Sequence, residues 1–278
     1  MDWLTVWEIP VGKTAKAAFD WLKTSFKAEF KAIGNAVEAV IEGFADLLQA
    51  MPPLVLIAML VALTWGIQRK WQKCFFVLAC LLFIINQGYW PKTTETLALI
   101  TFVCITCMAL GVPIGVSAAH NPRFYAAIQP ILDMMQTLPP PVYLIPFVIL
   151  FGIGVVPAFF ASIIFVLPSS IRMTHLGVST TPTALLEAAT AFGATKRQVL
   201  WKVELPYAFP QIMAGLNQTI MFSLSMVVIS AWVGAAGLGV PVVEALNRVR
   251  ADQGFESGFV VVALAIALRV AFHRETAK

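Results

Sequence analysis

Long apolar runs without charged residues dominate the sequence and limit the folds open to it. The stretches 53–68, 74–90 and 210–235 contain no Asp, Glu, Lys or Arg. In a bilayer the backbone polar groups must be satisfied internally, so such runs form either helices or the strands of a closed barrel. These runs are continuous rather than alternating, which favours helices. With 59% hydrophobic residues, 12% charged residues and a mean hydropathy of +0.81, the sequence predicts an all-α membrane protein.

Seven transmembrane helices are predicted from the apolar runs. The fourth run is shorter than the roughly 20 residues that a straight span needs. Gly152 and Gly154 stand at its end and Pro157 follows, so its upstream end is expected to include part of 129–141. The predicted spans cover residues 53–68, 74–90, 95–118, 142–154, 156–173, 210–235 and 257–272.

Basic residues near the span ends predict the direction of insertion, because cytoplasmic loops carry an excess of Lys and Arg. They follow the first, fifth and seventh spans, and with seven spans these three positions share one side. We therefore expect the amino terminus outside and the carboxyl terminus in the cytoplasm (N-out, C-in). The residues concerned are Arg69, Lys70, Lys73, Arg172, Lys196, Arg197, Lys202, Arg269, Arg274 and Lys278.

An amphipathic helix is predicted before the first span, over residues 13–50. Its charges exclude a span, and its apolar stripe predicts that it lies on the membrane surface. A coiled-coil arm that pairs with a partner is the alternative, since the same stripe would serve it. The stripe consists of Phe19, Leu22, Phe26, Phe30, Ile33, Val37, Ile41, Phe44 and Leu48.

Residues for catalysis or metal binding are scarce. The three histidines, His120, His175 and His273, have no second histidine at metal-binding spacing. We therefore predict no catalytic residue, no metal ligand and no cofactor. The net charge of +4 is too small to suggest nucleic acid as a partner. Ion-driven transport is disfavoured because spans such as 74–90 and 210–235 hold no Asp, Glu, Lys or Arg.

One polar segment lies between two apolar runs and reads EAATAFGATKRQVLWKVELP from Glu187 to Pro206. Pro182 is expected to open a helix, Gly193 to permit a turn and Pro206 to start the next element. The two alanines after Glu187 give the first helix a slim face that fits a groove. A helix-turn-helix placed in a membrane protein's cytoplasmic loop indicates a docking site for a partner.

The spacing of this segment resembles the cytoplasmic signature of permease subunits of binding-protein-dependent ABC importers. The matching positions are Glu187, Ala188, Ala189, Gly193, Leu205 and Pro206. Val203 stands where isoleucine is commoner, which keeps a β-branched apolar side chain. Residues 132–157 and 212–230 resemble the glycine betaine, proline and choline branch. The resemblance covers residues 93–273 and implies a type I importer permease core in a bacterial inner membrane.

Domain boundaries are expected from this resemblance. Residues 1–51 would form the amino-terminal amphipathic extension, and 52–92 two accessory transmembrane helices. The permease core would occupy 93–273, and 274–278 would be a cytoplasmic tail.

The resemblance also implies the partners. Two permease copies would line one path through the membrane lipid. Two ABC ATPase subunits would bind ATP and contact the six residues of the signature. An external binding protein would deliver choline, glycine betaine or proline betaine. The chain itself would then be a transport subunit and not an enzyme. An osmotically responsive channel and an ion-coupled secondary transporter are the alternatives. Substrate-binding residues are not assigned.

Overall fold

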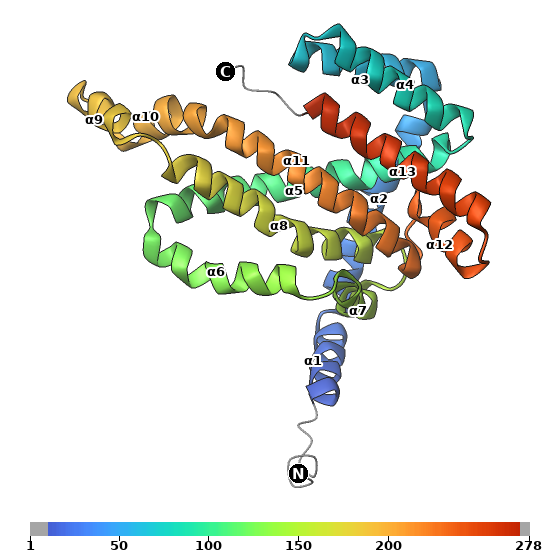
Figure 1. Cartoon of the computed structure of the whole chain (residues 1–278). Coiled ribbons are helices and arrows are strands. Elements are labelled where there is room, and N and C mark those ends of the chain that lie inside the picture. Colours follow the sequence, from blue (N-terminus) through green and yellow to red (C-terminus); the bar gives the residue numbers. More distant parts are fainter. Residues whose placement is uncertain (1–10, 273–278) are drawn as a thin grey trace, which may run out of the picture.

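The computed structural model describes residues 11–272, and this part of the chain is helical without any strand (Figure 1). The predicted tail at 274–278 and the first ten residues of the predicted extension lie outside the described residues. The sequence-based prediction of an all-α chain is confirmed.

Three long helices form the centre of the fold: α5 (Trp90–His120), α8 (Val155–Ser179) and α11 (Leu205–Ser230). Figure 1 shows them running side by side along one direction, with α5 behind the other two. The 31 residues of α5 span about 46 Å at 1.5 Å per residue, more than a hydrocarbon core of about 30 Å. Side chains such as Val103 and Val166 are completely buried between these helices.

Glycines let the three central helices approach closely. A Cβ atom added to Gly115 of α5 would lie 2.6 Å from the Cβ of Thr174 on α8. One added to Gly215 of α11 would lie 2.9 Å from the Cβ of Met173. Small residues at such crossings permit van der Waals packing between membrane helices, where lipid supplies no hydrophobic driving force.

The predicted fourth span is broken into α6 (Pro122–Thr137) and α7 (Pro140–Phe151), which are bent by 94°. Pro139 and Pro140 stand at the bend, and a residue before proline is disfavoured in helical conformation. The chain then continues through α8 and α11 to a 3₁₀ turn, η3 (Ala231–Val233). The last two helices are α12 (Gly239–Asn247) and α13 (Ala251–Phe272).

The two predicted accessory spans are the antiparallel helices α3 (Pro53–Gln68) and α4 (Trp71–Asn86), which pack against α13. Each has 16 residues, fewer than a straight span of roughly 20 needs. In the described part, four helices are long and apolar enough to cross a membrane, or six elements if each bent pair is one span. The number seven and the direction of insertion therefore stay predictions.

The amino-terminal helix is divided into α1 (Val11–Ser25) and α2 (Lys27–Ala50), and both cross the direction of the central helices (Figure 1). Much of the predicted stripe faces the protein itself: Ile41 and Leu48 are buried, and α2 packs against α5, α7 and α8. The rings of Phe44 and Phe102 meet edge to face, 5.5 Å apart. The apolar face of α2 thus has an intramolecular partner that the sequence-based interpretation missed.

Candidate coupling site

The segment that carries the predicted docking residues protrudes at one end of the central helices (Figure 1). It consists of residues 181–204, called the coupling loop below. Its first helix, α9 (Thr183–Ala191), has Pro182 as its N-cap, as expected, and none of its residues is buried. The side chains of Glu187 and Ala188 are exposed. Within the described chain α9 contacts α10 and the turn η2 of the same loop, yet most of its surface stays exposed.

Gly193 ends α9 in the way that the sequence predicted. Its φ is +76°, in the left-handed region that favours glycine. The N–H of Gly193 donates to the carbonyl of Thr190 at 2.9 Å, and the N–H of Ala194 donates to that of Ala189 at 3.1 Å. This pair of bonds is the Schellman motif, and it satisfies carbonyls at the end of α9.

The return path begins with Thr195, whose hydroxyl accepts from the N–H of Gln198 while the Gln198 side chain accepts from the N–H of Thr195. This capping box starts α10 (Lys196–Val199), which passes into a π-helical turn, η2 (Leu200–Glu204), and then into α11. Pro206 stands at the first turn of α11. It does not begin a separate helix, because the π-helical turn leads into it without a break.

The coupling loop exposes large apolar side chains beside its charges. Phe192 is 93% exposed and Trp201 is 63% exposed, and Leu185 of α9 is also exposed. Contiguous exposed apolar groups with a polar rim are typical of protein interaction sites. The arrangement fits a surface that is completed by a partner.

Glu204 connects the coupling loop to α5. Its carboxylate is buried and contacts Nε2 of His120, at the end of α5. The distance from this nitrogen is 3.0 Å to Oε2 and 3.2 Å to Oε1. The other ring nitrogen, Nδ1, lies 2.9 Å from the carbonyl oxygen of Val116. A carbonyl and a carboxylate can only accept, so both contacts are satisfied when both ring nitrogens carry a hydrogen.

The sequence-based interpretation missed this pair because the two residues are 84 positions apart. The available signal was a glutamate within an otherwise apolar helical start, since a buried carboxylate requires a partner.

A second missed ion pair joins α6 to α8. Nη2 of Arg172 lies 2.6 Å from Oδ1 of Asp133. Asp133 lies in the interior of α6, as does Pro130. The ring of Tyr125 stacks on that of His175 at a centroid distance of 3.6 Å and holds the same two helices together.

Residues 111–273 match the family described as "Binding-protein-dependent transport system inner membrane component". The match covers α8, the coupling loop, α11 and α13. The chain belongs to this family. It is therefore a multi-pass protein of the inner membrane, as the sequence predicted, and a transport permease component by family.

Curated relatives extend the similarity beyond the matched family region. The chain is 42% identical to the glycine betaine transport system permease protein OpuAB of Bacillus subtilis, over 94% of this chain and 92% of the relative. It is 41% identical to the glycine betaine/carnitine permease GbuB of Listeria monocytogenes, over 94% and 93%. It is 40% identical to the glycine betaine/proline betaine permease ProW of Escherichia coli, over 94% and 73%.

Solved structures support the same fold. An inward-facing structure of the MetNI methionine ABC transporter matches with a TM-score of 0.56 and 25% sequence identity, over 69% of this chain and 92% of that chain. A second crystal form gives the same TM-score over 61% and 86%. The predicted type I importer permease core is confirmed at the level of the fold.

Proposed function

We propose that this chain is the permease subunit of an ATP-driven importer of quaternary ammonium compounds: choline, glycine betaine or proline betaine. The observation that carries the proposal is the coupling loop, whose first helix, α9, buries no residue and which is joined directly to two membrane-crossing helices, α8 and α11. The named substrates of the 40–42% identical relatives support the quaternary amine class.

An ABC ATPase subunit would bind the coupling loop. Its contacts would include Glu187, Ala188 and Ala189 of α9 and the turn at Gly193. Leu205 and Pro206 would carry the motion into α11. ATP would be bound and hydrolysed by that partner, so this chain needs no nucleotide site of its own. Closure of the ATPase pair would favour the conformation whose contacts it fits, which shifts the permease between inward-facing and outward-facing states.

Contacts around the coupling loop explain how motion would reach the membrane. A Cβ on Gly177 of α8 would lie 2.9 Å from Cβ of Gln211 and 3.0 Å from that of Ala208 on α11, so these two helices pack closely beside the loop. His120 and Glu204 tie α5 to the same point. Displacement of α9 would therefore move three helices as one body.

A second permease copy would complete the path. Apolar side chains along α6 and α7 are exposed in the single chain, where another copy would cover them. They are Ile131, Met134, Leu138, Val142 and Ile145. An external binding protein would deliver the solute and select it, since aromatic faces there attract a trimethylammonium group by about 2 kcal/mol when desolvated.

Reconstituted transport tests the proposal. The tagged chain is purified from its native membrane together with its co-purifying subunits and placed in liposomes. Accumulation of labelled choline, glycine betaine and proline betaine is then measured with the binding protein outside the liposomes and ATP inside them. We expect accumulation that requires hydrolysable ATP and is absent with a non-hydrolysable analogue.

The alternatives give different results in the same assay. A channel would equilibrate the solute without ATP, and an ion-coupled transporter would respond to a sodium or proton gradient. Either result contradicts the proposal, as does ATP-dependent accumulation of unrelated solutes without accumulation of any quaternary amine.

A further inference from the structure

Two cavities, together called the groove below, lie along one face of α11, one beside the loop between α3 and α4 and one between α5, α11 and α13. Phe209 and Met213 of α11 line a cavity of about 620 Å³ together with Gln68, Arg69 and Lys70. Leu216 and Ile220 line a second cavity of about 350 Å³. Positions 209, 213, 216 and 220 are spaced by four, three and four residues, so they form one stripe on the helix.

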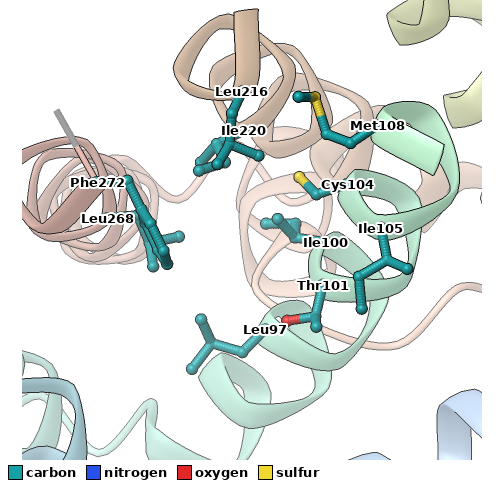
Figure 2. A pocket seen from close by; sticks show the side chains of 10 residues that line it. All are labelled: Leu97, Ile100, Thr101, Cys104, Ile105, Met108, Leu216, Ile220, Leu268 and Phe272. Carbon is teal, nitrogen blue, oxygen red and sulfur yellow. The ribbon is translucent and has the colours of Figure 1, made fainter. Parts of the chain in front are cut away.

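The cavity lined by Leu216 and Ile220 is mainly apolar. Figure 2 shows side chains from α5, α11 and α13 around one open space, with Leu268 and Phe272 on one side and Thr101 and Cys104 on another. Cys104 and Thr101 contribute its few polar atoms. A dry cavity of this kind, in a helical bundle that lies in lipid, suits a hydrocarbon chain.

The cavity beside the loop between α3 and α4 is lined by two cations, Arg69 and Lys70. Trp65 and Trp71 flank Arg69 and Lys70, and the two indole rings contact each other at 4.7 Å. Both tryptophans are exposed. Tryptophans with exposed faces mark the membrane interface, where Lys and Arg attract anionic lipid headgroups.

Segments that line the two cavities contact each other. Nε2 of Gln68 donates to the carbonyls of Val270 and Ala271, at 3.0 and 3.3 Å, which brings the basic loop against the residue that precedes Phe272. Along α11 the distance from Phe209 to Ile220 is about 16 Å, close to the half-thickness of about 15 Å of a hydrocarbon core. The groove therefore matches one leaflet in depth.

We propose that this groove holds one anionic phospholipid, with its phosphate at Arg69 and Lys70 and an acyl chain between α5, α11 and α13. The lipid would join the accessory helices α3 and α4 to the central bundle on the face opposite α6 and α7. The proposal does not depend on which solute is carried.

Native mass spectrometry of the full chain tests this site. The protein is delipidated in mild detergent and titrated with palmitoyl-oleoyl phosphatidylglycerol or with phosphatidylcholine of the same chains. We expect phosphatidylglycerol to bind about tenfold more tightly, which corresponds to ~1.4 kcal/mol and is in the range of two cations near a membrane surface.

Two variants distinguish binding of the lipid headgroup from binding of the acyl chain. In R69N/K70Q the preference for phosphatidylglycerol should disappear; asparagine suits the left-handed φ of +51° at position 69, so the turn is retained. T101F fills the apolar cavity and should weaken both lipids equally. The matched control K31S/R248S removes two exposed cations elsewhere and should bind like the unaltered chain.

Three results would overturn the proposal: equal binding of the two lipids by the unaltered chain, unchanged selectivity in R69N/K70Q, or unchanged binding in T101F. Dimers that form through this groove and exclude lipid would also overturn it. Gel filtration and far-ultraviolet circular dichroism verify that each variant is folded, so loss of binding is not confused with loss of structure.

Discussion

The central bundle and the coupling loop differ in what holds them in place. In the bundle, α5, α8 and α11 meet through glycines whose neighbours leave no room for a Cβ, and residues such as Val103 and Val166 are fully buried. In the coupling loop, α9 has no buried residue, and its shape depends on local caps at Pro182, Gly193 and Thr195. The bundle is specified by packing within the chain, whereas the loop has a preformed, exposed surface at which we propose that another protein binds.

The largest expected effect is in the bundle. G115L places a side chain where even a Cβ would be 2.6 Å from Cβ of Thr174. Overpacking a tight site costs about 3 kcal/mol or more, so we expect little folded protein. Yield after gel filtration and thermal unfolding in detergent measure this. G258L is the control, because nothing lies within 4 Å of a Cβ there; equal loss in both variants would contradict the difference between the sites.

The second expected effect is a loss of transport without a change in the stability of the protein. Glu187 is exposed on α9, so E187R should change neither yield nor unfolding temperature. Reversing a charge at a docking surface should reduce ATP-driven uptake by about a hundredfold, within the usual range of coupling between sites. The control E38R, at an exposed position of α2, should transport normally. Normal uptake by E187R would contradict the proposal that the coupling loop is a docking surface.

The third effect tests the connection between the two regions. H120A leaves the buried Glu204 carboxylate without its imidazole, which should cost about 2 kcal/mol. The double variant H120A/E204A removes both partners and should recover part of this loss. Unfolding free energies in a double-mutant cycle give the coupling between the residues. Strict additivity of the two single changes would show that the pair does not connect α5 to the loop.

The smallest effect is confined to the loop's turn. G193A forces an alanine to a φ of +76° and should cost about 1 kcal/mol locally. Faster amide hydrogen exchange in residues 183–195, without a change in α8 or α11, would follow. G43A, in α2 with open space around it, is the control. Unchanged exchange in G193A would mean that the left-handed turn is not needed.

Local chemistry explains which features could be predicted from the sequence. The cap at Pro182 and the turn at Gly193 depend on neighbouring residues only, and both are confirmed. The long apolar runs likewise predict α5, α8, α11 and α13, although their ends differ by several residues.

Features that depend on tertiary contacts were missed. The sequence pattern of α2 showed an apolar face but not its partner, which turned out to be the chain's own core. His120 and Glu204 meet only because α5 and the π-helical turn end at the same place. The bend at Pro139 interrupts a run that hydropathy alone presents as the fourth span. The coupling role of the signature residues is still a prediction, because it depends on a second protein.

Co-purification tests the central claim most directly. The tagged chain is extracted gently from its native membrane, and the proteins that accompany it are identified by mass spectrometry, beside a variant in which Glu187 and Gly193 are both replaced. The account predicts a nucleotide-binding ATPase with the unaltered chain and a marked reduction with the variant, at equal recovery of folded permease. An ATPase absent from both samples, or recovered equally with both, would contradict the assignment of the coupling loop.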